Sequence, residues 1–163
     1  MKNRENNANE KTNVLRVLDA RKIIYSSYAY NPDPSLTGSD IAKILGEEPS
    51  RVFKTLVTQG KSGNYYVFVV PVNQELDLKK AAKASNEKFI AMIKQRDLLP
   101  LTGYVHGGCS PVGMKKQFQT FIHESAMNYE KIFVNAGKVG LQVEISPQDL
   151  IGVIKCAVCD IAS

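Results

Sequence analysis

The stretch VFKTLVTQGKSGNYYVFVVPV, residues 52–72, decides the fold class. Its two halves are rich in β-branched and aromatic residues and flank the turn sequence GKSGN, residues 60–64, so the stretch predicts a β-hairpin. The second half is almost entirely apolar, which is typical of a strand buried near the centre of a sheet. The segment KIFVNAGKVGLQVEIS, residues 131–146, has the same organisation around Gly137 and predicts a second hairpin.

Short helices are expected between these strands. Residues 14–23 and 40–45 have apolar positions at helical spacing, and residues 76–85 are good helix formers. A further helix is predicted over residues 147–154, where a proline occupies the first turn. Hairpins that alternate with single helices predict a mixed α/β fold around a largely antiparallel, barrel-like sheet.

The composition is that of one soluble domain. The chain has 163 residues, 44% of them hydrophobic and 23% charged, with a formal net charge of +5. Residues 1–12 are polar and rich in asparagine, so we expect a flexible tail followed by a single domain over residues 13–163. We see neither a membrane-spanning run nor the apolar core of a signal peptide, and three cysteines fit reduced thiols, so we expect a cytoplasmic protein without membrane contact.

Several cofactor sites are disfavoured by the motifs. Neither GxGxxG after a strand nor GxxxxGK[ST] occurs, which argues against the common nucleotide-binding loops. Cys156 and Cys159 form a CxxC pair, but a zinc site needs two further ligands, and a redox pair usually opens a helix. Because the pair lies in an apolar run with helical character, we expect the two cysteines to pack in the core and predict no metal or cofactor.

The stretch TGYVHGGCSP, residues 102–111, has more glycine than a simple turn needs. Successive backbone N–H groups in such a loop can form a concavity that binds an anion or an oxyanion. Two other interpretations are a plain loop and a site in which Cys109 is the nucleophile, although no complete set of catalytic partners is recognisable. The glycine-bearing turn at residues 135–140 is expected to face this loop across a pocket.

Lys54 is the one charged residue in an otherwise apolar strand segment. Strand alternation places it on the same face as Leu56 and Thr58. A lysine on such a face often lines a pocket, but lysine is equally common on edge strands, where it prevents aggregation. Periodicity alone does not separate these two alternatives.

The order of these pieces resembles that of the YbaK/EbsC family of stand-alone aminoacyl-tRNA deacylases, relatives of the editing domain of bacterial prolyl-tRNA synthetases. The resemblance extends from about Val14 to Ala162, and its pieces are specific as an ordered set. They are Tyr30-x-x-Asp33-Pro34, Val52-Phe53-Lys54-Thr55-Leu56, Val70-Pro71-Val72 before Leu76-Asp77-Leu78-Lys79-Lys80, Thr102-Gly103-Tyr104, Gly107-Gly108-x-Ser110-Pro111-x-Gly113-x-Lys115-Lys116, and Gly137-Lys138-x-Gly140-Leu141.

The resemblance implies hydrolysis of misacylated tRNA, typically Cys-tRNA(Pro), with the tRNA as partner and prolyl-tRNA synthetase as a second candidate partner. It also implies three catalytic positions, which are Lys54, Gly107 and Tyr30. The remaining positions of the two glycine-bearing turns are implied to bind the substrate: Gly108, Cys109, Ser110, Pro111, Asn135, Gly137 and Gln142.

Two departures from the family pattern lie in the second hairpin. The family usually has an aspartate where this chain has Gln142, and a glycine where it has Ala136. An amide can form hydrogen bonds but cannot act as a carboxylate base. The alternatives are therefore a deacylase for another small amino acid, such as alanine or serine, and a non-catalytic module that binds aminoacyl-tRNA or a synthetase.

Overall fold

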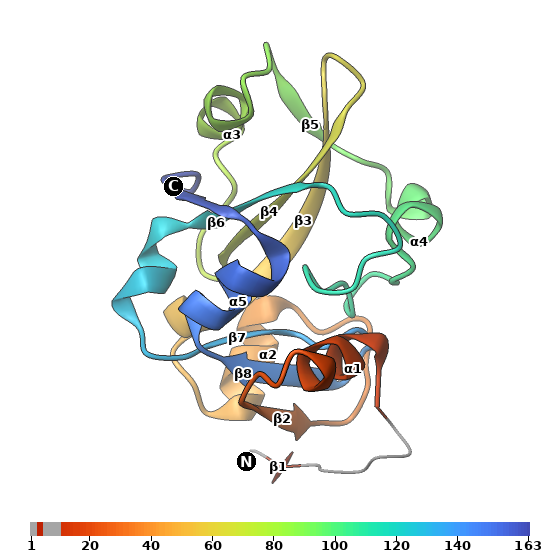
Figure 1. The fold of residues 1–163 in the computed structure, drawn as a ribbon, viewed down its shortest axis with the longest axis vertical. Coiled ribbons are helices and arrows are strands. Elements are labelled where there is room, and N and C mark those ends of the chain that lie inside the picture. Colours follow the sequence, from red (N-terminus) through yellow and green to blue (C-terminus); the bar gives the residue numbers. More distant parts are fainter. Residues whose placement is uncertain (1–2, 5–10) are drawn as a thin grey trace.

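The computed structural model describes residues 3–4 and 11–163, and in this part of the chain it confirms the mixed α/β fold (Figure 1). The described strands form two sheets, one of four strands and one of five. Neither sheet closes into a barrel. Instead, a parallel bridge between Val52 and Phe133 joins them at the point where the larger sheet enters its first hairpin.

The smaller sheet is antiparallel and has the strand order β1-β2-β8-β7. The predicted second hairpin is confirmed as β7 and β8, in which Asn135 lies opposite Gln142. Its strands are β1 (Asn3–Arg4), β2 (Tyr25–Ala29), β7 (Ile132–Asn135) and β8 (Leu141–Ile145).

The larger sheet has the order β5-β3-β4-β6-β9. The predicted first hairpin is confirmed as β3 and β4, with Lys54 opposite Val70. β6 pairs with both β4 and β9 in parallel, whereas the other pairings of this sheet are antiparallel. Its strands are β3 (Phe53–Gly60), β4 (Tyr65–Pro71), β5 (Ile90–Met92), β6 (Gln119–His123) and β9 (Ala157–Cys159).

The four predicted helices are present, and each begins after a polar residue in extended conformation. Thr37 and Asp40 form a capping box at the start of α2, and Gly46 ends that helix in the left-handed conformation. The helices are α1 (Asn13–Ala20), α2 (Gly38–Leu45), α3 (Leu78–Ser85), α4 (Gln95–Thr102) and α5 (Pro147–Ile154), with single 3-10 turns at η2 (Pro49–Arg51) and η3 (Glu124–Asn128).

The main core lies between the two sheets, where α1 and α5 complete it (Figure 1). Two smaller clusters cover the outer faces. α2 packs on the smaller sheet through Ile41 and Leu45 against Phe133, and α3 packs on the larger sheet through Ala81 against Phe68. The start of α1 contacts the turn between β7 and β8, and the start of α2 lies near the beginning of β3.

Two expectations are corrected by the fold. The CxxC pair is not helical, because β9 runs through Cys159 and pairs in parallel with β6; Cys156 is nevertheless buried and Cys159 half-buried, both as free thiols. Helix α4 was not predicted from the sequence, because Pro100 lies inside it.

Most of the predicted tail over residues 1–12 lies outside the described residues. Within it, residues 3–4 pair with β2, and Thr12 caps α1 by accepting a hydrogen bond from the N–H of Leu15. In the described part of the chain, no helix has the length and apolar character needed to cross a membrane.

Candidate active site

A cleft of about 350 Å³ opens between the start of α2, strand β3 and the glycine-rich loop. Clefts of this size suit a small ligand or one end of a larger one. Its apolar lining includes Ile41, Val52, Phe53, Leu56, Val72 and Leu98, and its polar lining includes Lys54, Thr55, His106, Asn135 and Gln142. Among the described residues, no aspartate or glutamate side chain lines it.

Lys54 supplies a positive charge to the cleft. The lysine side chain is 26% exposed, and its Nζ lies 3.7 Å from Oε1 of Glu75, whose own side chain is 86% exposed. An ion pair with so exposed a partner is weak, because water and salt screen it. The ammonium is therefore available to an anionic group or a developing negative charge in the cleft.

The two adjacent glycines of the glycine-rich loop are needed for different reasons. Gly107 lines the cleft with a φ of +89°, a conformation that favours glycine. Gly108 packs on the turn between β7 and β8, where an added Cβ would lie 2.8 Å from the carbonyl carbon of Lys138. The two glycine-bearing turns thus touch each other directly, and the cleft lies beside their contact rather than between them.

Gly108 and Ser110 stabilise the glycine-rich loop through hydrogen bonds inside it. The N–H of Gly108 donates to the carbonyl oxygen of Val105 at 3.0 Å, so this amide is already used inside the loop. Ser110 is fully buried and its hydroxyl accepts from the N–H of Val112 at 3.2 Å. Of the predicted loop residues, Gly107 and Cys109 line the cleft, whereas Gly108, Ser110 and Pro111 do not.

The start of α1 holds both turns in place. The Thr12 hydroxyl donates to the carbonyl oxygen of Ala136 at 2.6 Å, and Nδ2 of Asn13 donates to that of Gly113 at 2.9 Å. Gly137 has a φ of +96°, a conformation that favours glycine, and it packs against α1, where an added Cβ would lie 3.0 Å from a methyl group of Val14. Gly137 therefore shapes the turn and does not line the cleft.

Buried polar side chains form the floor of the cleft. Gln142 is 1% exposed, and its Nε2 donates to Oδ1 of Asn135 at 2.5 Å. Oε1 of Gln142 and Oγ1 of Thr55 are buried without a hydrogen-bond partner among the residues that the structure describes. Unsatisfied buried polar atoms cost free energy, so their presence at a cleft indicates a ligand that supplies the missing partners.

The titratable side chains near the floor are neutral. Burial raises the pKa of the Tyr30 phenol, an effect that the Gln142 side chain partly offsets. Burial also raises the pKa of the Cys109 thiol to about 12. A nucleophilic cysteine needs a lowered pKa, so Cys109 has the properties of a packing residue and not those of a catalytic thiolate.

The cleft joins five of the residues singled out from the sequence. Tyr30 lies behind this set, beside Gln142. The lining also includes Leu98 of α4, His106 beside Gly107, and residues 34–38 at the start of α2. None of these residues was predicted from the sequence to belong to the site. The capping sequence at Thr37 marks that segment as the start of a helix, but no pattern there indicates a ligand. The five residues are Lys54, Gly107, Cys109, Asn135 and Gln142.

The two sides of the mouth carry opposite charge. Lys94 precedes α4, and Arg96 lies in its first turn, two residues before the cleft-lining Leu98; both are exposed, as is Asp97 between Arg96 and Leu98. On the side of α2, Asp33 and Asp40 are exposed, and hydrogen bonds from Ser35 and Thr37 respectively lower the pKa of each carboxyl. A polyanion that enters the cleft is therefore attracted toward α4.

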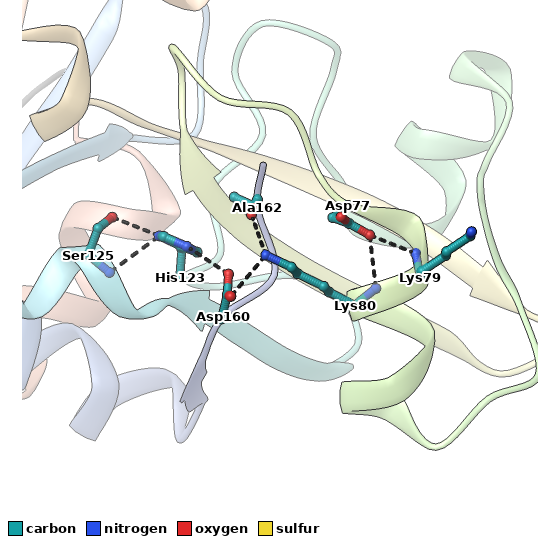
Figure 2. A network of polar contacts seen from close by, with 7 residues as sticks. All are labelled: Asp77, Lys79, Lys80, His123, Ser125, Asp160 and Ala162. Carbon is teal, nitrogen blue, oxygen red and sulfur yellow. Dashed lines mark hydrogen bonds and ion pairs between the residues drawn. The ribbon is translucent and has the colours of Figure 1, made fainter.

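A second polar cluster lies near the C-terminal end of the chain (Figure 2). His123 contacts Ser125 at 2.8 Å through Nδ1 and Asp160 at 3.4 Å through Nε2, and Nζ of Lys80 lies 2.9 Å from the same carboxylate. His123, Glu124 and Asp160 are close enough to share a metal ion. However, Lys80 already neutralises Asp160, so the cluster joins α3 to β9 rather than forming a cation site.

Comparisons with known proteins agree in one direction. The family model described as "Aminoacyl-tRNA editing domain" matches residues 33–153. A protein of Enterococcus faecalis named "Putative Cys-tRNA(Pro)/Cys-tRNA(Cys) deacylase EbsC" is 46% identical over 143 residues, which cover 87% of each chain. A proline–tRNA ligase of Fervidobacterium nodosum is 33% identical over 86 residues, which are 53% of this chain and 15% of the ligase.

A solved structure supports the fold. It is described as "a putative trans-editing enzyme for prolyl tRNA synthetase", and it superposes with a TM-score of 0.80 at 23% sequence identity. The superposition covers 93% of this chain and 95% of that one. At this identity the likeness concerns the fold alone.

Proposed function

The chain belongs to the aminoacyl-tRNA editing domain family, and on that basis we propose that it is a trans-editing hydrolase. The reaction is cleavage of the ester bond of a misacylated tRNA, and the foremost substrate is Cys-tRNA(Pro). The observation that carries the proposal is a small cleft in which Lys54 and Gly107 face a floor of unpartnered polar atoms. The name of the Enterococcus faecalis relative supports the choice of amino acid.

The cleft suits a small amino acid. Its volume of about 350 Å³ accommodates an aminoacyl group and a part of the terminal ribose, but not a whole nucleotide chain. The apolar wall formed by Ile41, Val52 and Leu56 matches a thiol or methyl group. A methylene group changes binding by only about 1–3 kcal/mol, so alanine and serine esters are the natural competitors.

The mechanism needs little from the protein, because an aminoacyl ester is already activated. Lys54 lies where its charge can stabilise the negative oxygen of the tetrahedral intermediate or bind the terminal phosphate. The attacking oxygen comes from water, or a group of the substrate itself attacks. The acyl–oxygen bond to the ribose then breaks, and the proton of the nucleophile goes to the leaving ribose oxygen.

The wider partner is the acceptor end of the tRNA in the cytoplasm. Lys94 and Arg96 beside the mouth provide a non-specific attraction for the phosphate backbone. The chain has few clustered basic residues, so choice of the tRNA is assigned to a synthetase partner. The likeness to a part of proline–tRNA ligase makes prolyl-tRNA synthetase the first partner to test.

The test is release of amino acid from Cys-tRNA(Pro), Ala-tRNA(Pro) and Ser-tRNA(Pro) at low protein concentration, together with the Kd for each tRNA. We expect the fastest release from Cys-tRNA(Pro). If a different ester is cleaved faster, the substrate is reassigned. If all three tRNAs bind and none is cleaved, the chain is a binding module and the hydrolase proposal is wrong.

A further inference from the structure

Gln142 lines the cleft and carries a buried hydrogen-bond acceptor, Oε1. It lies in β8 between Tyr28 of β2 and Asn135 of β7, and only 1% of it is exposed. Asn135 accepts from its Nε2, which fixes the amide at one end. Oε1 at the other end is buried and has no partner among residues 3–4 and 11–163.

The donor that reaches this acceptor is the α-amine of the aminoacyl group. The ester group has only acceptors, and a thiol is a weak donor. The ribose hydroxyls are donors, but the nucleotide must stay at the mouth, because the tRNA chain leaves the cleft there. The α-amine is therefore the strong donor that fits the floor.

The surrounding charges decide the protonation state of that amine. Among the described residues that line the cleft there is a lysine, Lys54, and no carboxylate. Near the cleft, the buried side chains of Tyr30 and Cys109 are neutral, and His106 is exposed. An ammonium would thus be buried near a like charge, without a compensating anion.

The nearest carboxylates do not change this balance. Glu144 shares the face of β8 with Gln142, but it is bound by Tyr28 at 2.7 Å and by Arg51 at 3.2 Å. Glu75 is exposed beyond Lys54. Asp33 and Asp40 lie on the exposed rim beside α2, where each accepts hydrogen bonds from its own loop, and they are outside the lining.

We propose that Gln142 is a specificity-determining residue, whose Oε1 accepts a hydrogen bond from the neutral α-amine of the aminoacyl ester. The cleft then takes its substrate with the amine deprotonated and leaves the proton in solution. This inference rests on the proposed function and adds to it the chemical form of the substrate. An aspartate or glutamate at position 142 would instead attract the ammonium form.

The test uses a substrate analogue that cannot be hydrolysed, 3′-cysteinylamino-3′-deoxyadenosine, in which an amide replaces the ester. The pKa of its α-amine is first measured by titration of the free analogue. Its Kd for the wild-type protein is then measured by calorimetry, or from inhibition of deacylation if binding is weak. Below the pKa of the amine, we expect Kd to fall about tenfold for each unit of rising pH, and above it to level off.

Three variants and one matched analogue separate the amine from other titrations. In Gln142→Glu the carboxylate prefers the ammonium, so the slope should vanish or reverse. In His106→Gln the slope should persist, which excludes the imidazole as its cause. The desamino analogue, built on 3-mercaptopropionate, should bind without pH dependence and lose nothing in Gln142→Met, whereas the amino analogue should lose about tenfold.

The outcomes distinguish this inference from the proposed function. If wild type cleaves Cys-tRNA(Pro) but binds the analogue equally or more tightly at low pH, the neutral-amine inference is wrong and the hydrolase stands. If the slope is present but no ester is cleaved, Gln142 recognises the amine in a binding module. If His106→Gln removes the slope, the titration belongs to the imidazole and the inference is overturned.

Discussion

The backbone of Gly108 lies against the backbone of Lys138, so closely that a Cβ at position 108 would be 2.8 Å from the Lys138 carbonyl carbon. This contact joins the glycine-rich loop to the turn between β7 and β8. It places Gly107 and Cys109 on one wall of the cleft and Asn135 on its floor. The geometry of the site therefore depends on a residue that does not touch the substrate.

Substitution of this glycine tests the contact. Gly108→Ala forces the two turns apart, and overpacking of this kind costs about 1–3 kcal/mol of unfolding free energy. We expect a lower urea midpoint and slower deacylation. The matched control is Gly152→Ala in α5, where an added Cβ meets nothing within 4 Å and helix propensity favours alanine by up to ~1 kcal/mol. Equal stability of Gly108→Ala and wild type would show that the turns can separate freely.

Removal of the Cys109 thiol should leave the reaction intact. With a pKa of about 12, roughly one thiol in 10⁴ is ionised at pH 8, which is too few for a nucleophile. We expect Cys109→Ala to keep kcat/KM within the order of magnitude of wild type, with a moderate loss of stability from the small cavity. A folded Cys109→Ala protein without activity would contradict this assignment, and urea unfolding of the same sample shows whether it is folded.

The cluster in Figure 2 gives a prediction on pH and stability. Lys80 lowers the pKa of Asp160 below its ordinary 3.8, and Asp160 raises that of Lys80 above its ordinary 10.5. The carboxylate stabilises the fold above pH 3.8, and this contribution is lost as the pH falls through its folded pKa. The ammonium stabilises it below pH 10.5, and this contribution is lost as the pH rises through its folded pKa.

Lys80→Ala should therefore lower the urea midpoint at pH 7 and have less effect at about pH 3. Lys79→Ala is the control, because the side chain of Lys79 points away from the cluster (Figure 2). A difference between the two variants that persists unchanged at low pH would contradict the ionic origin of the effect. The expected change is small, since Lys80 and Asp160 are both substantially exposed.

The basic side of the mouth predicts how tRNA binding responds to charge. In Lys94→Glu/Arg96→Glu, we expect a weaker Kd for tRNA and a smaller salt dependence, by about two counterions. Acidic residues at the start of α4 favour the helix dipole, so the fold should be retained. The double substitution Lys79→Glu/Lys83→Glu on α3 makes the same change of charge away from the cleft and should have little effect. Equal losses in both double variants would mean that only net charge matters.

Local patterns predicted the hairpins well. The strands β3 and β4 follow from runs of β-branched and aromatic residues and from the turn residues between them, and the same holds for β7 and β8. β9 was assigned to a helical run, because its strand character comes from parallel pairing of Phe121 with Ala157, residues far apart in sequence. Such pairing leaves no local trace in an apolar stretch of a few residues.

The candidate site was also predictable only in part, because only some of its residues have a local sequence signal. Lys54 and the glycine-bearing turns could be singled out, because a charge in an apolar strand and a surplus of glycine are visible in sequence. Leu98 could not be singled out, because Pro100 argues against a helix over the residues that form α4. The close approach of Gly108 to Lys138 also has no sequence signal, since many glycines serve conformation instead of contact.

The central claim is that Lys54 supplies the charge that hydrolysis of the ester requires. Removing a preorganised charge or donor of this kind typically slows a reaction by about 10²–10³-fold. The matched control is Lys61→Ala, an exposed lysine on the turn that follows β3. Both variants should unfold at urea concentrations similar to that of wild type, since Lys54 makes only a weak, exposed ion pair.

The most direct measurement is single-turnover deacylation of Cys-tRNA(Pro) by wild type, Lys54→Ala and Lys61→Ala. The account predicts that wild type and Lys61→Ala release cysteine at similar rates, and that Lys54→Ala is slower by about 10²-fold or more. A folded Lys54→Ala protein that releases cysteine at the wild-type rate would contradict it.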